Sequence, residues 1–131
     1  MADTKIKILI VEDDLFIREL YERQLALAGY EVSSAADGPE GLLKVNEVHP
    51  DLLLLDIMLP KMNGLDLLKT IKAKDDTKMI PVILLTNLGQ DSVIKEGFNL
   101  GADGYLNKSA YTPDQIIEEI KKFLDQNVRT Q

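Results

Sequence analysis

The chain has 131 residues, of which 45% are hydrophobic and 28% are charged. These values are typical of one folded domain and leave no room for a second domain of similar size. There is no cysteine, and the single histidine is His49. Disulfide frameworks, thiolate chemistry and multi-histidine metal sites are therefore excluded, and a histidine-based catalytic triad is disfavoured. We expect His49 to be an exposed loop residue without a role.

Fifteen basic and 22 acidic residues give a formal net charge of −7. An acidic domain repels phosphate backbones, so direct binding to nucleic acid is disfavoured. A membrane-spanning helix needs about 20 apolar residues, and the longest apolar runs here have only four. The residues Met1 to Lys5 carry no apolar signal region. We expect a cytoplasmic protein that binds neither nucleic acid nor membrane.

Five β-type runs alternate with amphipathic helical stretches along the chain. Strands are expected at Ile6–Val11, Glu31–Ala35, Leu52–Asp56, Pro81–Leu85 and Gly104–Leu106. The first and third runs contain four consecutive apolar residues, which is typical of strands buried on both faces of a parallel sheet. The second and fifth runs are short and mixed.

Helix ends are marked by capping residues. Gly29 follows an apolar helical pattern that begins near Ile17 and acts as a stop. Further helices are expected to start at Asp37-Gly38-Pro39, at Asn63-Gly64 and at Thr112-Pro113. The last start is the clearest, because Thr112 can cap the helix and Gln115 completes a capping box. We expect the charged run 72–78 to be a solvated helix end and loop. Gly97 indicates either a soft signalling surface or a close packing contact.

Five alternating β/α pairs with short connections predict an α/β fold with a doubly wound, parallel, five-stranded sheet. In such sheets, binding sites form at the carboxyl ends of the strands, near the point where the strand order reverses. We expect one domain over residues 1–131. Its core should span about residues 5–124, with frayed ends at 1–4 and 127–131.

Polar residues follow the predicted strands where each strand ends. They are Glu12 and Asp13 after the first strand, Asp56 after the third, Thr86 after the fourth and Lys108 after the fifth. Clustered carboxylates repel one another unless a cation neutralises them, and an all-oxygen ligand set suits Mg²⁺. A carboxylate beside Mg²⁺ and a lysine can attack a phosphoryl group, because the cations neutralise its oxygens. The residues therefore indicate a phosphoryl-accepting aspartate.

Each of these residues also has an ordinary structural interpretation. Glu12 and Asp13 could be an acidic helix start, with Asp14 as its cap, and Lys108 could be a solvated loop lysine. Asp56 is harder to explain, because a carboxylate that closes a four-leucine strand is a poor core residue without a partner. Only the joint placement favours the functional interpretation.

From about Lys5 to Leu124 the chain resembles the receiver domain of two-component response regulators. The resemblance rests on matching segments in the expected order: ILIVEDD at 8–14, DIMLPKMNG at 56–64, Leu85-Thr86, GADGYL at 101–106 and Lys108. It implies the flavodoxin-like strand order 2-1-3-4-5, for which a chemotaxis receiver is a standard example.

The resemblance implies a role for each residue at the strand ends. Asp56 would be the phosphorylated residue. Asp13 and Asp56 would bind Mg²⁺ directly together with the backbone carbonyl of Met58, and Glu12 would act through a metal-bound water. Lys108 would pair with a phosphoryl oxygen. The protein would be a signalling phospho-acceptor that assists its own phosphorylation and dephosphorylation, rather than an enzyme with turnover.

The resemblance also implies a switch. Thr86 would move to bond a phosphoryl oxygen, and Tyr105 would swing inward to fill the space it leaves, although Tyr105 alone reads as a half-buried sheet residue. The face of helix four, strand five and helix five would then change its partner preference. The partners would be a histidine kinase or phosphotransfer protein and a downstream protein, and a phosphorylation-dependent homodimer is a further option.

The chain departs from the family in three places. Lys108 is commonly followed by proline after a cis bond, whereas here Ser109 follows. A non-proline cis bond costs ~3 kcal/mol, so the bond is either trans with a rearranged loop or cis and strained. Asn87 stands where a small residue usually follows the threonine and is expected to narrow access to the phosphoryl group. Met58 and Leu88 cannot orient an attacking water, which predicts a long-lived phosphoaspartate.

Three other functions stay open. A pseudo-receiver that binds partners without phosphorylation would share the fold, but the full acceptor set disfavours it. A flavodoxin-like cofactor binder is disfavoured because no phosphate-binding loop follows the first strand and no glycine-rich dinucleotide fingerprint occurs. A metal-dependent hydrolase with Asp56 as nucleophile would usually offer a second acid nearby, whereas Ile57 and Met58 follow here.

Overall fold

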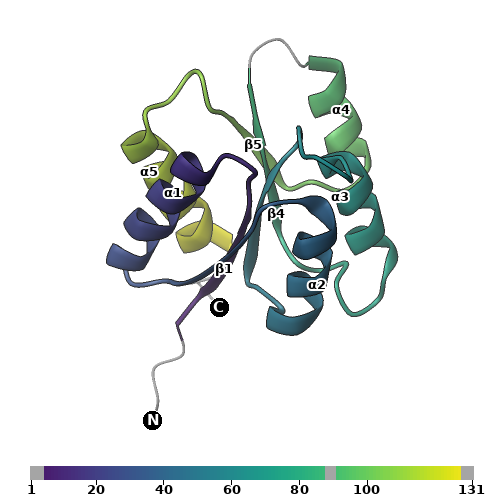
Figure 1. The fold of residues 1–131 in the computed structure, drawn as a ribbon, viewed down its shortest axis with the longest axis horizontal. Coiled ribbons are helices and arrows are strands. Elements are labelled where there is room, and N and C mark those ends of the chain that lie inside the picture. Colours follow the sequence, from purple (N-terminus) through teal and green to yellow (C-terminus); the bar gives the residue numbers. More distant parts are fainter. Residues whose placement is uncertain (1–4, 88–90, 128–131) are drawn as a thin grey trace.

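The computed structural model describes residues 5–87 and 91–127, which form strands and helices in alternation (Figure 1). The strands are β1 (Lys7–Val11), β2 (Glu31–Ala35), β3 (Leu52–Asp56), β4 (Val82–Thr86) and β5 (Gly104–Asn107). The helices are α1 (Leu15–Leu27), α2 (Gly38–Val48), α3 (Gly64–Ala73), α4 (Asp91–Asn99) and α5 (Pro113–Asn127). All five predicted strands are present, with bounds that differ by at most one residue.

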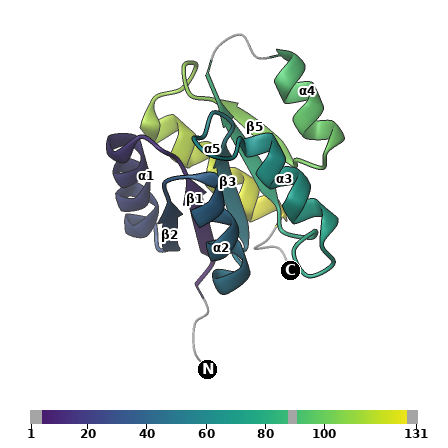
Figure 2. The ribbon, with the colours of Figure 1, turned by 45° about the vertical axis from the view of Figure 1, so that its right-hand side comes forward.

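The strands form one parallel sheet in the order β2-β1-β3-β4-β5. Helices α1 and α5 cover one face of the sheet, and α2, α3 and α4 cover the other (Figures 1 and 2). The predicted doubly wound fold and its strand order are therefore confirmed. The strand order reverses between β1 and β3, so a site at that point draws on both strand ends.

Two hydrophobic cores lie on either side of the sheet, because alternate strand residues point to opposite faces. Ile8 and Ile10 of β1 face α1 and α5, whereas Leu9 and Val11 face α2 and α3. The four leucines of β3 divide in the same way, and all of them are fully buried. At ~1.5–3 kcal/mol for each fully buried aliphatic side chain, these runs hold the sheet between its two helical layers.

The predicted helix starts are confirmed by their capping bonds. The carboxylate of Asp14 accepts the backbone N–H of Ile17 at 3.0 Å. Thr112 and Gln115 form the reciprocal capping box, in which each side chain accepts the other residue's backbone N–H, at 3.2 and 2.8 Å. Each cap satisfies N–H groups that a helix start otherwise leaves unpaired.

Glycine is needed at positions 29 and 97 for different structural reasons. Gly29 follows α1 at φ +100°, a left-handed conformation that ends the helix as predicted. Gly97 in α4 is buried, and a β-carbon there would overlap the side chain of Leu84. Of the two interpretations of Gly97, close packing of α4 against β4 is therefore the one the structure supports. No helix in the described part of the chain could span a membrane.

The expectation of a solvated loop over residues 72–78 is wrong for Lys72 and Thr77. The Lys72 ammonium donates to the carbonyls of Lys78 and Ile80, at 3.1 and 2.7 Å, and lies 3.6 Å from the Asp103 carboxylate. The hydroxyl of Thr77 is buried and donates to the carbonyl of Ile71. These bonds fasten the loop to α3, because Ile71 and Lys72 belong to that helix and their partners lie in the loop that follows it.

The predicted frayed ends fall mostly on residues 1–4 and 128–131, which lie outside the described residues. Helix α5 continues through Asn127, so it extends beyond the predicted end of the core at residue 124. The predicted loop position of His49 is confirmed, because this exposed residue caps α2 in a left-handed conformation.

Candidate functional site

Three carboxylates converge at the carboxyl ends of β1 and β3. Glu12 and Asp13 follow β1, and Asp56 is the last residue of β3; we call these three residues the acidic cluster. They offer ligand oxygens that all lie within 4.8 Å of one another. Glu12 and Asp56 are only 1% and 4% exposed, whereas Asp13 is exposed. The two strands are hydrogen-bonded neighbours, which is why acids 43 positions apart meet here.

Lys108 enters the acidic cluster from the turn after β5. Its ammonium lies 2.7 Å from Glu12 Oε1 and 3.3 Å from Asp56 Oδ2. The Lys108 side chain is 10% exposed. Its backbone N–H donates to the carbonyl of Thr86 at 2.7 Å, so the backbone is fixed to the end of β4. The structure thus places one cation against two buried carboxylates.

Burial and mutual repulsion alter the protonation of this cluster. Burial raises the pKa of Glu12, and the neighbouring Asp56 adds to the rise, although Lys108 opposes it. Burial also raises the pKa of Asp13, with a further contribution from Glu12. Burial disfavours a charged Lys108, but Glu12 and Asp56 outweigh it and raise the pKa of Lys108. The site therefore carries more negative charge than one lysine neutralises.

The turn that carries Glu12 is held from three sides. The backbone N–H of Glu12 donates to the carbonyl of Ala35 at 3.0 Å, and its carboxylate accepts the N–H of Asp14 at 3.2 Å. The guanidinium of Arg18 donates to the Glu12 carbonyl at 2.9 Å. Sequence reasoning missed Arg18, and the only available signal was its place one helical turn after the cap Asp14.

The loop between β3 and α3 closes tightly around Asp56. The backbone N–H of Met58 donates to Asp56 Oδ1 at 3.1 Å, while the Met58 side chain is 62% exposed. The N–H of Gly64 donates to the carbonyl of Ile57 at 2.8 Å. A β-carbon at Gly64 would overlap the carbonyl oxygen of Asp56, so α3 can begin this close to β3 only with glycine here.

Thr86 ends β4 beside this cluster and is 2% exposed. Its hydroxyl is buried and has no hydrogen-bond partner among the described residues. Buried polar groups are nearly always paired in native proteins, so an orphaned hydroxyl indicates a missing partner. A ligand with an acceptor oxygen would satisfy it.

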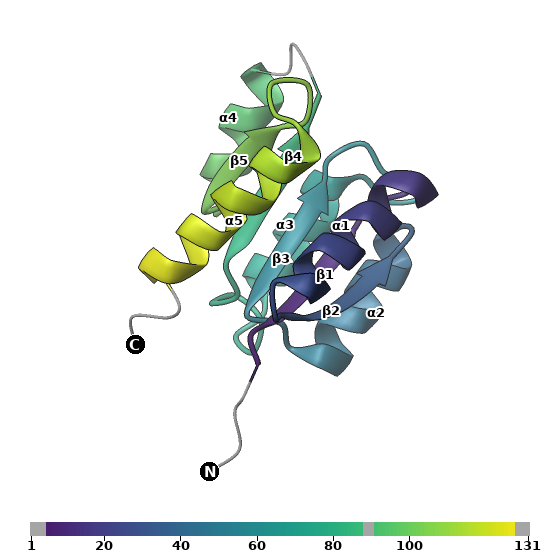
Figure 3. The ribbon, with the colours of Figure 1, turned by 90° about the vertical axis from the view of Figure 1, so that its left-hand side faces the viewer.

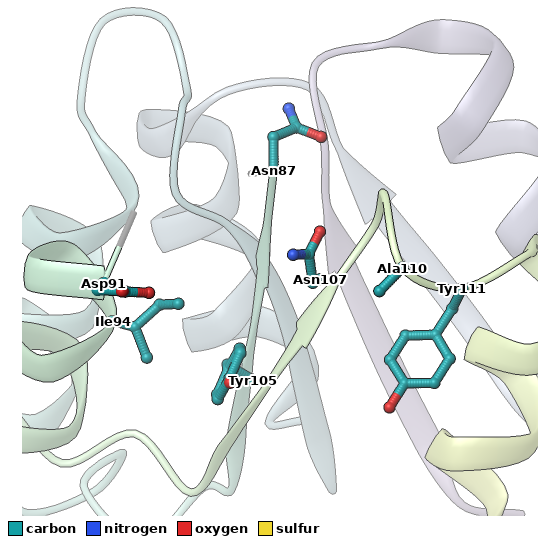
Figure 4. Close-up of a pocket in the computed structure, with 7 residues that line it drawn as sticks. All are labelled: Asn87, Asp91, Ile94, Tyr105, Asn107, Ala110 and Tyr111. Carbon is teal, nitrogen blue, oxygen red and sulfur yellow. The ribbon is translucent and has the colours of Figure 1, made fainter. Parts of the chain in front are cut away.

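Tyr105 lies apart from the acidic cluster, on the outer face of β5. Its ring is 45% exposed and packs edge-on against Phe98 of α4, with ring centres 6.0 Å apart. A pocket of about 430 Å³ lies beside it (Figure 4). The pocket is lined by Asn87, Asp91, Ile94, Tyr105, Asn107, Ala110 and Tyr111. Asn87, which is exposed, is one of these lining residues.

The turn after β5 contains the departure from the family at Ser109. No peptide bond in the described part of the chain is cis, so the Lys108–Ser109 bond is trans. The backbone N–H of Ser109 donates to the side-chain oxygen of Asn107 at 2.8 Å, and the N–H of Ala110 donates to the Asn107 carbonyl at 3.0 Å. Of the two predicted alternatives, the strained cis bond is excluded, and Lys108 still reaches the acidic cluster.

The donor set of the acidic cluster fits Mg²⁺. All its ligand atoms are carboxylate oxygens, and the chain offers no cysteine and only one histidine, which follows the end of α2. Hard oxygen ligands of this kind suit Mg²⁺, which keeps several waters. The exposed Asp13 leaves one side of the cluster open to solvent.

The comparisons with known proteins show the family of the chain. The family model of the response regulator receiver domain matches residues 8–121. The chain belongs to this family: it is a receiver domain of the response regulators, which are signalling proteins.

Two of the similar proteins are transcriptional regulators. The chain is 37% identical to the DNA-binding transcriptional regulator RpaA of Synechocystis over 118 residues, which are 90% of this chain and 48% of RpaA. It is 36% identical to the PhoP regulator of Bacillus subtilis, with 90% of this chain and 48% of PhoP covered. This chain therefore spans about half the length of these relatives.

Solved receivers have the same fold. A CheY-like receiver domain protein from Methanospirillum hungatei superposes with a TM-score of 0.87 at 33% identity, covering 98% of this chain and all of that one. Chemotaxis protein CheY4 of Vibrio cholerae superposes with a TM-score of 0.83 at 31% identity, covering 91% and 98% of the two chains.

Proposed function

We propose that Asp56 is the phospho-acceptor of this receiver domain and that a phosphohistidine of a histidine kinase or phosphotransfer protein is the donor. The observation that carries the proposal is the environment of Asp56. Its buried carboxylate lies 3.3 Å from the Lys108 ammonium, beside a strand that ends in the unpartnered hydroxyl of Thr86. A nucleophile, a fixed cation and a free donor are the groups that phosphoryl transfer needs.

In the proposed reaction, a carboxylate oxygen of Asp56 attacks the phosphorus of the donor. A bond from this oxygen to phosphorus forms, and the bond from phosphorus to the donor imidazole nitrogen breaks. The bonding electrons stay on that nitrogen, which takes up a proton. Lys108 offsets the negative charge of the phosphoryl oxygens, and the Thr86 hydroxyl donates to one of them.

Mg²⁺ is the cofactor of this proposal. Asp13 and Asp56, together with the backbone carbonyl of Met58, would hold the ion, and Glu12 would act through a metal-bound water. The ion supplies positive charge that offsets the phosphoryl oxygens and the repulsion within the acidic cluster. Burial is the main cause of the raised pKa values of Glu12 and Asp13, and the neighbouring carboxylates add to the rise, so a bound cation would favour their ionised forms.

The output of the proposed switch is the face formed by α4, β5 and α5. Thr86 would turn toward the phosphoryl group, and Tyr105, which now stands exposed against Phe98, would move inward. The pocket beside Tyr105 would change shape with it (Figure 4). A downstream protein would distinguish the two shapes, and a second phosphorylated copy is the alternative partner.

The proposed function is that of a single signalling domain. Residues 1–131 form one receiver domain that assists its own phosphorylation and dephosphorylation without acting as a turnover enzyme. It works in the cytoplasm, where it meets its kinase, and contacts neither nucleic acid nor membrane itself. The DNA-binding function of RpaA belongs to a protein about twice as long.

The test is intact mass after incubation with Mg²⁺ and acetyl phosphate. We expect the protein to gain one phosphoryl group and Asp56→Asn to gain none. Asp75→Asn is the matched control, because Asp75 is 97% exposed on a loop and should not affect the gain. A folded wild-type protein that gains nothing would overturn the proposal, and so would an Asp56→Asn variant that is phosphorylated as readily as the wild type.

A further inference from the structure

The turn after β5 is closed by the residues on either side of Lys108. The side-chain oxygen of Asn107 accepts the N–H of Ser109 at 2.8 Å, so this hydrogen bond spans Lys108. The carbonyl of Asn107 accepts the N–H of Ala110 at 3.0 Å. An asparagine that bonds the backbone two residues ahead mimics a tight turn and fixes the residue between.

A second hydrogen bond fixes the backbone of Lys108 to the end of β4. Its N–H donates to the carbonyl of Thr86 at 2.7 Å, and Asn107 is the register partner of Thr86 across β4 and β5. The lysine therefore leaves the sheet at a defined place and direction. Its long side chain then reaches Glu12 and Asp56 at 2.7 and 3.3 Å.

The bond from Ser109 to Asn107 depends on a donor that proline lacks. Proline has no backbone N–H, so a turn with proline after the lysine could not form this bond. The serine supplies the N–H, and Asn107 supplies the acceptor that meets it. The hydrogen bond between these two residues stabilises a turn that has a trans peptide bond and no proline.

We propose that Asn107 is the positioning residue of this receiver: its side chain locks the Lys108–Ser109 turn so that the Lys108 ammonium is held in the acidic cluster. This inference rests on the proposed function, because the effect on phosphorylation runs through the role of Lys108. Figure 4 shows Asn107 beside the turn, between Asn87 and Ala110.

Loosening the turn has two effects of opposite direction. With the ammonium less often in place, the charge of the phosphoryl oxygens is less well offset, and phosphorylation slows. The same loss leaves Glu12 and Asp56 less neutralised, so the acidic cluster attracts a divalent cation more strongly. General damage to the site would weaken both properties together.

The experiment compares four variants of the full chain. Asn107→Ala removes the acceptor, and Asn107→Asp keeps an acceptor oxygen in the same position. Ser109→Pro removes the donor, and Ser109→Ala keeps the backbone N–H and serves as the matched control. For each we would measure Mg²⁺ affinity by calorimetry without any phosphodonor, the phosphorylation rate with acetyl phosphate at saturating Mg²⁺, and thermal unfolding.

We expect Asn107→Ala and Ser109→Pro to slow phosphorylation about tenfold, which corresponds to ~1.4 kcal/mol of barrier. In both, Mg²⁺ should bind at least twofold more tightly. Asn107→Asp should restore most of the rate, and Ser109→Ala should match the wild type. Equal rates in all four variants would overturn the inference, and so would weaker Mg²⁺ binding in Asn107→Ala and Ser109→Pro.

The two proposals can fail separately. If the wild type accepts no phosphoryl group, the proposed function fails, but the calorimetric comparison of Asn107→Ala with the wild type still tests whether Asn107 holds Lys108. If phosphorylation occurs on Asp56 at the same rate in every variant, the proposed function stands and the inference about Asn107 is overturned.

Discussion

Glu12 is a carboxylate that the fold buries at a cost. Burial raises its pKa above the ordinary 4.5, and Asp56 raises it further. An acid with a raised pKa in the folded state stabilises the fold below its unfolded pKa, and this contribution is lost as the pH rises through the folded value. The raised pKa of Lys108 changes the stability of the fold only above about pH 10.5, well above the pH range in which Glu12 ionises.

The first prediction concerns Glu12→Gln in the absence of Mg²⁺. The free energy of unfolding of the wild type should fall relative to this variant as the pH rises from about 4.5 to neutrality, because only the wild type must ionise a buried acid. Urea denaturation at a series of pH values measures it. A wild type that gains stability relative to Glu12→Gln over this range would contradict the assignment.

The second prediction concerns Met58, whose exposed thioether cannot orient a water. Met58→Asn should speed loss of the phosphoryl group about tenfold, or ~1.4 kcal/mol of barrier, because an amide can position the attacking water. The decay of phosphorylated protein after removal of the donor measures this rate. Met79→Asn is the matched control, since Met79 is also exposed, at 82%, but lies on the loop before β4. Equal decay in both variants would exclude a role for position 58.

The sequence predicts those site residues that stand directly at the ends of predicted strands. Glu12, Asp56 and Lys108 each follow an apolar run, and a parallel sheet brings such ends to one edge. The roles of Arg18 and Asn107 could not be predicted, because each acts through a backbone carbonyl or N–H. Such partners depend on the local path of the chain, which residue types alone do not specify.

At the level of the elements, the start of α3 depends on close approach to β3. Gly64→Ala should reduce the free energy of unfolding by about 1–3 kcal/mol, because its methyl group would overlap the backbone of Asp56 and cannot be relieved by a side-chain rotation. Gly104→Ala is the control, since a β-carbon there meets only Ile83 at an ordinary 3.8 Å. Denaturation midpoints compare them. Equal stability of the two variants would show that the loop before α3 adapts.

Lys72 connects α3 to the loop before β4 through a largely buried ammonium. Lys72→Met should destabilise the fold by about 1–3 kcal/mol, because the carbonyls of Lys78 and Ile80 lose their donor. Lys69→Met changes an exposed lysine of the same helix and should have little effect. Urea denaturation of both variants measures the loss in the free energy of unfolding. A loss no larger than that of Lys69→Met would mean that Lys72 is only a surface residue.

The elements themselves could be predicted closely, because strands buried on both faces and helices with explicit caps leave strong local patterns. The charged run at 72–78 shows where this fails. Its residues have the composition of a solvated loop, but the Lys72 ammonium donates to the carbonyl of Ile80 and Thr77 is buried. Both depend on carbonyls that only the tertiary structure presents.

For the whole molecule, the proposed switch would couple Asp56 to a face on the far side of β4. The chain has no tryptophan, so Tyr105→Trp adds a single fluorescent reporter to that face. Phosphorylation with acetyl phosphate should make this reporter less accessible to acrylamide, because the ring is expected to move from its exposed position toward the interior. Tyr111→Trp, across the same pocket, is the comparison. Equal quenching of Tyr105→Trp before and after phosphorylation would exclude the inward movement.

The direction of the sheet has a practical consequence. Strand β1 begins and α5 ends toward one end of the molecule, and β1 and β3 end toward the other (Figure 3). The acidic cluster stands at these carboxyl ends of β1 and β3. A bead, a dye or a second folded protein joined before the start of β1 or after the end of α5 would sit away from the carboxyl edge of the sheet. Immobilisation through such a linker should therefore leave the approach of a phosphodonor unobstructed, which makes the domain suitable for tethered measurements of single phosphorylation events.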